Sequence, residues 1–196
     1  MKNTKGGEPM TESERRYLSA YPRETISIGV TGDGQAKYSV WVPWAYDVNA
    51  YNMHTPDIWL SPAELLDEDL WTGLARLRVV GCYLFTPLTD YSFLFRLPHL
   101  RDLHIYKGFF LPDLTFLRSM PHWCQLHIED AVLPDLTDLA KNGCCICLSG
   151  CTVKDLSALE AVRLSELVIL MPEGSREKAR WQNVSCGKYT YHEYKP

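Results

Sequence analysis

The chain has 196 residues, 46% of them hydrophobic and 22% charged, with a formal net charge of −4. This composition predicts a globular protein with one sizeable core, and the length excludes two comfortable domains. The net negative charge gives no broad electrostatic reason for binding to nucleic acid or to an anionic membrane, and leaves only a local basic patch open.

Cysteine usage and hydropathy indicate the compartment. The seven cysteines are odd in number and clustered, which is typical of reduced thiols; Cys144 and Cys151 are expected to be small core fillers. The first residues lack the apolar core of a signal peptide, and no later stretch approaches about 18 consecutive apolar residues. We therefore expect the protein to be cytoplasmic and to have no membrane partner.

The amino-terminal segment begins with a polar stretch. Residues 1–10 are polar and glycine-bearing, so we expect a disordered tail. Thr11-Glu-Ser-Glu14 has the spacing of a capping box, in which the hydroxyl and the carboxylate each satisfy a free amide of the first helical turn. A short helix is expected from there to Ala20, because Pro22 stops it.

Two alternating segments follow. Residues 25–30 and 37–42 alternate apolar with small or polar residues around Gly32-Asp-Gly34, a pattern that predicts a β-hairpin. The glycines at 29, 32 and 34 do not favour a phosphate-binding loop, because neither a Lys-Ser/Thr pair nor a helical pattern follows them.

Residues 43–60 are rich in Trp, Tyr, Asn and Pro, and we consider two interpretations of them. In the first, the rings pack as a cover over one end of the fold. In the second, they form an exposed aromatic patch for a peptide or a sugar, since Trp and Tyr are favoured at interfaces.

A second capping box comes next. Ser61-Pro62-Ala-Glu64 has the required spacing and places proline at the first helical position. An amphipathic helix is expected to continue from it through Leu65, Leu66, Leu70 and Leu74.

An internal repeat organises the rest of the chain. His99-Leu-Arg-Asp-Leu-His-Ile105 returns as His122-Trp-Cys-Gln-Leu-His-Ile128, and extending the alignment gives five units of a strand and a return segment. The strand segments are 74–79, 100–105, 123–128, 143–148 and 164–169. The return segments open on an aspartate suited to a helix N-cap, with apolar residues one and four positions later: Asp90, Asp113, Asp135 and Asp155.

At these residues the chain resembles the leucine-rich repeat family, and residues 155–169 look most like the short repeats of internalins. The resemblance covers residues 74–170 and implies an α/β fold, a short right-handed solenoid of about five parallel strands whose units bury their apolar faces together. The position of the family's asparagine ladder holds other residues, so we expect the loops to close differently and the solenoid to be irregular. These residues are Cys82, Gly108, Ala131, Cys151 and Pro172.

The remaining segments are expected to cover the two ends of the solenoid, within one structural domain. Residues 11–73 form the amino-terminal cap with its helix and hairpin, 74–172 the repeats, and 173–196 the carboxyl-terminal cap. In the last segment, Ser175 caps a short helix, and residues 184–191 make a final strand or a small hairpin that protects the unpaired edge of the repeats.

Strand alternation places three columns of side chains on the concave face, beside the core leucines. The columns are Arg76, Asp102, Gln125, Cys145 and Glu166; Arg78, His104, His127, Cys147 and Val168; and Val80, Tyr106, Glu129, Ser149 and Leu170. Parallel strands lie about 4.8 Å apart, so neighbours within a column are close in space. Both charge signs, an aromatic ring and an apolar end are typical of a protein recognition surface.

The sequence therefore predicts a non-catalytic protein–protein interaction domain, monomeric and without a cofactor, whose partner is another protein and not a nucleic acid. A scaffold subunit of a larger assembly is the alternative in the same class. The predicted partner-binding residues are Arg76, Arg78, Asp102, His104, Tyr106, Gln125, His127, Glu129, Cys147 and Ser149.

Two chemical alternatives use the same face. Cys147 beside His127, with Glu129 near, has the residue types of a nucleophile and its base, as in a small Cys/His enzyme. An open sheet neither lowers the pKa of a thiol nor excludes water, so we favour binding over catalysis. His104, His127 and Cys147 also have the residue types of a Zn²⁺ site, which would need a fourth ligand and oriented rings.

Overall fold

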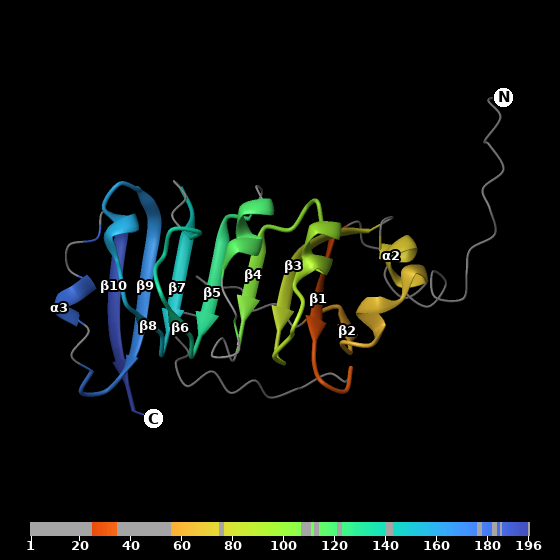
Figure 1. Cartoon of the computed structure of the whole chain (residues 1–196), viewed down its shortest axis with the longest axis horizontal. Coiled ribbons are helices and arrows are strands. Elements are labelled where there is room, and N and C mark those ends of the chain that lie inside the picture. Colours follow the sequence, from red (N-terminus) through yellow and green to blue (C-terminus); the bar gives the residue numbers. More distant parts are fainter. Residues whose placement is uncertain are drawn as a thin grey trace.

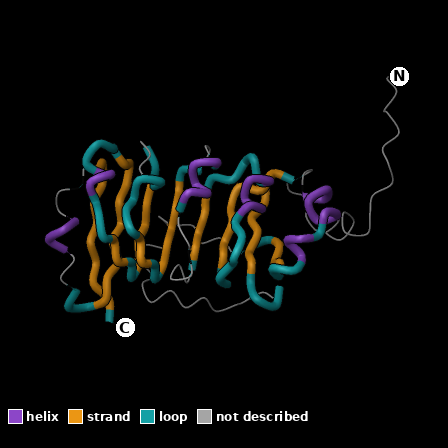
Figure 2. Tube along the Cα trace, in the orientation of Figure 1, coloured by secondary structure: helices purple, strands orange, loops and turns teal. Residues whose placement is uncertain are grey.

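The computed structural model describes residues 25–34, 56–74, 77–106, 111, 114–120, 123–139, 143–175, 178–181, 184 and 186–195. Within them the chain has a mixed α/β fold in which parallel strands dominate and the helices are few and short (Figures 1 and 2). The expected tail at 1–10, the helix from Thr11 to Ala20, the strand at 37–42 and most of segment 43–60 lie outside the described residues.

The strands are β1 (Thr25–Val30), β2 (Ile58–Leu60), β3 (Arg78–Leu84), β4 (Asp102–Ile105), β5 (Gln125–Glu129), β6 (Val132–Leu133), β7 (Cys145–Ser149), β8 (Thr152–Val153), β9 (Leu164–Pro172) and β10 (Cys186–Tyr194). The 3-10 helices are η1 (Glu64–Leu66), η2 (Ser92–Arg96), η4 (Thr115–Ser119) and η5 (Ser157–Leu159), and the α-helices are α2 (Glu68–Leu74) and α3 (Lys178–Trp181). None of the described helices is long and apolar enough to span a membrane.

Eight strands form one sheet in the order β10-β9-β7-β5-β4-β3-β1-β2, and every neighbouring pair is parallel (Figure 1). From β3 to β10 the order in space follows the order in the chain, while β6 and β8 form a small pair of their own. The expectation of about five strands is therefore wrong, because β1, β2 and β10 extend the sheet at its two ends.

The core confirms most of the repeat alignment. Leu103, Leu126, Ile146 and Leu167 are register partners across four successive strands, and each is at most 2% exposed. Leu77 does not continue this row, because Leu103 pairs with Cys82 on β3. Cys82 lies 21 residues before Leu103, close to the spacing of the later repeats, whereas Leu77 lies 26 residues before it.

The return segments after Asp90 and Asp155 contain the 3-10 helices η2 and η5, and the segment after Asp135 is a turn. The expected N-cap is displaced by one residue, because Tyr91 and Leu156 hold the cap positions and the aspartates precede them. Each carboxylate accepts a hydrogen bond of 2.8 Å from the amide two residues later: Asp90 from Ser92, Asp135 from Thr137 and Asp155 from Ser157. These bonds satisfy amides that the short turn leaves free and lower the pKa of Asp90 and of Asp155. Asp113 lies outside the described residues.

The hairpin expected at residues 25–30 is wrong for the described part. β1 lies between β2 and β3 and is parallel to both, so both of its edges are occupied at Ile28–Val30. The physical reason is burial, since Ile26, Ile28 and Val30 enter the same core cluster as the repeat leucines. Pairing with distant strands buries these side chains, which a local turn would not achieve.

The capping box at Ser61 and Glu64 is confirmed. The Glu64 carboxylate accepts from the Ser61 amide at 2.9 Å and from its hydroxyl at 3.0 Å, and the Ser61 hydroxyl accepts from the Glu64 amide at 3.4 Å. The expected helix is divided into η1 and α2, and Leu66 at the end of η1 is 83% exposed, whereas Leu70 and Leu74 are buried.

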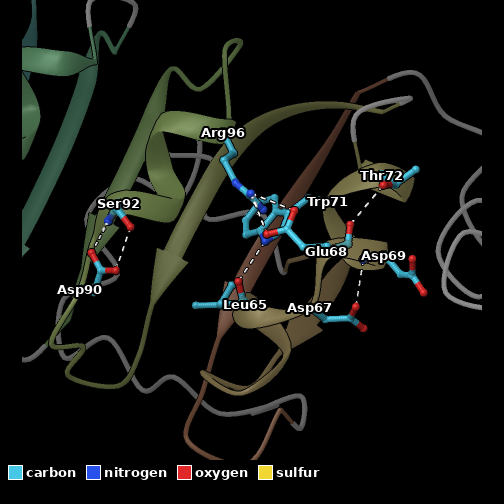
Figure 3. A network of polar contacts seen from close by, with 9 residues as sticks. All are labelled: Leu65, Asp67, Glu68, Asp69, Trp71, Thr72, Asp90, Ser92 and Arg96. Atoms are coloured by element: carbon cyan, nitrogen blue, oxygen red, sulfur yellow. Dashed lines mark hydrogen bonds and ion pairs between the residues drawn. The ribbon is translucent and has the colours of Figure 1, made fainter.

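Helix α2 is joined to η2 by the polar contacts in Figure 3. The Arg96 guanidinium donates to both carboxylate oxygens of Glu68, at 2.8 and 2.9 Å, and lies 5.3 Å from the centre of the Trp71 ring. The Trp71 indole donates to the carbonyl of Leu65 at 2.9 Å. Since Arg96 and Glu68 are exposed, their ion pair contributes about 1 kcal/mol at most, and the buried Trp71 does more to hold α2 in place.

The carboxyl-terminal strand is confirmed. β10 pairs with β9 along its whole length, and α3 lies beyond it at that end of the sheet (Figure 1). Trp181 is 1% exposed in the core, and the Arg180 guanidinium donates to the carbonyls of Val153 and Lys154 at 2.6 and 3.0 Å. Cys144 and Cys151 are buried core residues, as expected, and the Cys151 thiol donates to the carbonyl of Ile128 at 3.4 Å.

Two glycines, one before and one after β7, give a matched test of positive-φ backbone. Gly143 and Gly150 have φ of 77° and 61°; a Cβ on Gly150 would overlap Asp130 Oδ1, whereas among the described residues no atom lies within 4 Å of one on Gly143. Gly143→Ala is expected to cost about 1 to 2 kcal/mol in the free energy of unfolding, and Gly150→Ala to cost more. Urea denaturation measures both, and equal costs would contradict a fixed Asp130 carboxylate.

Candidate partner-binding surface

The sheet has a second face, opposite the main core, and the strand register arranges its side chains in three rows. The amino-end row is Asp102, Gln125, Cys145, Glu166 and Lys188. The middle row is Tyr83, His104, His127, Cys147, Val168 and Thr190. The carboxyl-end row is Phe85, Tyr106, Glu129, Ser149, Leu170 and His192.

Four of the five strands predicted to build this face carry the expected residues. The first of the five, β3, carries different residues from those predicted. Tyr83 lies in the place predicted for Arg78, since it pairs with His104, and Phe85 lies in the place predicted for Val80. Arg78 is exposed at the start of β3, where it pairs with Thr25, and Arg76 lies outside the described residues. The alternation of Tyr83 and Phe85 with Cys82 and Leu84 is the signal that would have placed this strand.

Aromatic rings stack along the middle and carboxyl-end rows. The ring centres of Tyr83 and His104 are 4.5 Å apart, and those of His104 and His127 are 5.6 Å apart. Beside them, Phe85 stacks on Tyr106 at 4.7 Å and Trp59 lies 5.3 Å from Phe85. The predicted columns of side chains are therefore real neighbours, and Trp59 belongs to this surface.

The middle of this face is closed to solvent, contrary to the open surface expected. His104 and Tyr106 are each 7% exposed, Cys147 is 5% exposed and Ser149 is fully buried. Within the described part of the chain, His104 Nδ1, the Tyr106 hydroxyl and His127 Nε2 are buried without a hydrogen-bond partner. Such atoms cost free energy, so the cluster is held by packing and stacking rather than by polar contacts.

Burial sets the protonation of the two imidazoles and the thiol. It lowers the pKa of His127 to about 4, and burial with the charge of His127 lowers the pKa of His104 to about 3. Burial raises the pKa of Cys147, and the acidic neighbours Glu129 and Glu166 raise it further. At neutral pH the pair of Cys147 and His127 is therefore a protonated thiol beside a neutral imidazole.

The residues proposed for zinc do not gather into a ligand set. His104, His127 and Cys147 are successive partners in the middle row, as predicted. Among the described residues, however, no three His, Cys, Asp or Glu side chains form a group that could hold a metal ion. The two rings face each other as a stack, and a tetrahedral site needs ligand atoms that converge on one point.

The amino-end row is the accessible part of the face. Gln125 and Lys188 are exposed, and Asp102, Cys145 and Glu166 are half-buried. Lys188 Nζ lies 2.7 Å from Glu166 Oε1, so this row presents an ion pair beside an uncharged amide and a thiol. Burial and the neighbouring Glu166 and Cys124 raise the pKa of Cys145, which keeps its thiol protonated and inert.

A scan against protein-family models finds no match, and searches of the curated proteins and of the solved structures find none either.

Proposed function

We propose that this chain is a non-catalytic domain of the leucine-rich repeat type, a short right-handed solenoid that binds another protein. It acts in the cytoplasm as a monomer and needs no cofactor. The partner lies along the amino-end row rather than over the whole second face.

The observation that carries this proposal is the accessibility of the amino-end row. Its side chains come from five successive strands about 4.8 Å apart, so they form a continuous strip of roughly 20 Å. The strip has both charge signs and neutral hydrogen-bonding groups, which suit a polar protein surface. The other two rows are mostly buried and offer a partner little contact.

Three features support the repeat type. The core residues recur at a spacing of 20 to 23 residues in one parallel register, and Asp90, Asp135 and Asp155 each bond the amide two residues later in a return turn. At the position of the family's asparagine ladder, the Cys151 thiol donates to the carbonyls of Ile128 and Ser149, both at 3.4 Å. A cysteine there closes the loop with a weak donor, which fits a repeat with short loops.

The test exchanges one exposed strand residue of each sheet for arginine. Gln125 lies in the middle of the amino-end row, and Thr152 is exposed on β8 of the small separate sheet. In affinity purification from lysate of the source organism, Gln125→Arg is expected to reduce the recovery of a specific partner by about tenfold or more, because a new charge is forced into a close contact.

Thr152→Arg is the matched control and is expected to retain the partner at the level of the natural chain. Thermal unfolding of both variants establishes that neither has lost its fold. A partner that Gln125→Arg keeps and Thr152→Arg loses would move the binding surface to the small separate sheet and refute the proposal.

A further inference from the structure

Two acidic residues lie together where β5 ends. Glu129 is the last residue of β5, and Asp130 follows it with a φ of 56°. Burial and the charge of Asp130 raise the pKa of Glu129, and burial raises that of Asp130. Among the described residues, no Lys or Arg forms an ion pair with either carboxylate. The ion pairs between described residues are Arg96–Glu68, Arg118–Asp138 and Lys188–Glu166.

The next repeat leaves room for the Asp130 carboxylate. Gly150 has the position in that repeat that Asp130 has in its own, since each follows one member of the register pair Glu129–Ser149. A Cβ on Gly150 would overlap Asp130 Oδ1 and would lie 3.4 Å from the Tyr194 hydroxyl. Because glycine has no side chain, a carboxylate after β5 and a hydroxyl from β10 lie near the same point.

Two further oxygens beside Glu129 are buried and have no hydrogen-bond partner among the described residues. They are the hydroxyls of Ser149, which is fully buried, and of Tyr106, which is 7% exposed. Ser149 projects from the same face as its register partner Glu129, about 4.8 Å away. Burial raises the pKa of Tyr106, and nearby acidic groups that include Glu129 raise it further, so the phenol lies close to this carboxylate. Buried hydroxyls without a partner are costly, and they point to a ligand that satisfies them.

The chemistry of these groups selects a hard divalent cation. All of them present oxygen, and the lone pairs of the hydroxyls supplement the charge of the carboxylates. Ca²⁺ takes about six to eight oxygen ligands in flexible geometry, whereas Mg²⁺ gives up its waters reluctantly. A cation that reaches buried hydroxyls has to lose water, which favours Ca²⁺. Since no three His, Cys, Asp or Glu side chains group as metal ligands among the described residues, hydroxyls and water complete the coordination.

We propose that Glu129, Asp130, Ser149 and Tyr106 form a binding site for Ca²⁺ at the carboxyl ends of neighbouring strands, with β5 and β7 at its centre (Figure 1). The carboxylates are open to solvent, because Glu129 is half-buried and Asp130 is exposed, and the two hydroxyls line the buried side. The site lies at the other end of the strands from the amino-end row. It therefore goes beyond the proposed partner and does not depend on it.

Titration of the full chain with CaCl₂, followed by proton–nitrogen correlation NMR, tests the site without a substitution. The amide signals of Asp130 and Gly150 are expected to shift and to saturate with a Kd of about 1 mM or tighter. The signals of Gly143, before β7, and of Glu160, an exposed residue after η5, are expected to stay in place. Shifts that do not saturate, or that are equal at Glu160, would show unspecific binding to surface carboxylates and overturn the proposal. MgCl₂ is the second arm, and binding as tight as that of Ca²⁺ would contradict direct contact with the hydroxyls.

Substitutions then assign the ligands. Glu129→Gln keeps the shape of the side chain and removes its charge, so it is expected to weaken Ca²⁺ binding by about tenfold or more. Ser149→Ala removes a neutral ligand and is expected to weaken binding by about threefold or more. Glu160→Gln is the matched control and should bind like the natural chain.

Thermal unfolding with and without CaCl₂ establishes that each variant folds and gives an independent measure of binding. A cation that binds only the folded chain raises Tm, and this rise is expected for the natural chain and for Glu160→Gln. It is expected to be smaller for Glu129→Gln and Ser149→Ala. Natural affinity in either of these two variants would overturn the proposal, and if neither folds, the titration of the natural chain decides.

Discussion

Replacing Leu126 with alanine lowers the free energy of unfolding by about 2 to 5 kcal/mol, a large share of the stability of a single domain. Leu126 is 2% exposed and lies in the middle of the sheet between its register partners Leu103 and Ile146. The truncation leaves a cavity that the neighbouring strands close only in part. Urea denaturation followed by circular dichroism measures the loss.

Leu66→Ala is the control for this experiment. Leu66 is the same residue type, but it is 83% exposed at the end of η1, so its truncation is expected to change stability by about 0.5 kcal/mol or less. Similar losses in the two variants would mean that the row of repeat residues is not the core of the protein.

Acidification is expected to destabilise the protein between about pH 6.5 and pH 4. Folding depresses the pKa of His127 from 6.5 to about 4 and that of His104 to about 3. Above pH 6.5 both states are neutral and there is no effect. As the pH falls toward the folded pKa values, these two histidines bind protons in the unfolded chain but not in the folded chain. Unfolding is therefore favoured.

The size of this effect follows from the shifts. For His127 alone, the difference between 6.5 and about 4 corresponds to about 3 kcal/mol once it is fully developed. Glu129 and Asp130 act in the opposite sense, because burial raises the pKa of both carboxyls and protonation of the folded state then favours folding at lower pH. The two histidines have the larger shifts and are expected to dominate.

The variant His127→Phe separates the imidazole from the other groups. Phenylalanine keeps a ring in the stack and removes the proton-binding site, so the dependence of stability on pH is expected to weaken by about one proton in this range. His99→Gln is the control, because His99 is exposed, and it should leave the dependence as it is. Urea denaturation at a series of pH values gives both slopes, and equal slopes for His127→Phe and the natural chain would refute the assignment.

The sequence by itself determined the features that depend on neighbouring residues and on repetition. The recurrence of Leu126, Ile146 and Leu167 predicted a parallel register, and strand alternation then placed His104, His127 and Cys147 in one row. Local hydrogen bonds could also be predicted from the sequence, as in the capping box at Ser61. These predictions are confirmed because apolar periodicity and short polar contacts act within one repeat or one turn.

Only the tertiary structure decided which distant segments pair and which side chains lose water. Segment 25–30 resembles one arm of a hairpin, yet it inserts between β2 and β3, because a strand gains more by burying Ile28 and Val30 in an existing core than by closing a local turn. The shift between Ile26 and Ser27 in the pairing with β3 brings Tyr83 opposite Gly29, and the pairing of β3 with β4 places Tyr83 beside His104. The burial of His104 likewise depends on neighbours outside its own strand, such as Tyr83 and His127, and no pattern within the strand carries that information.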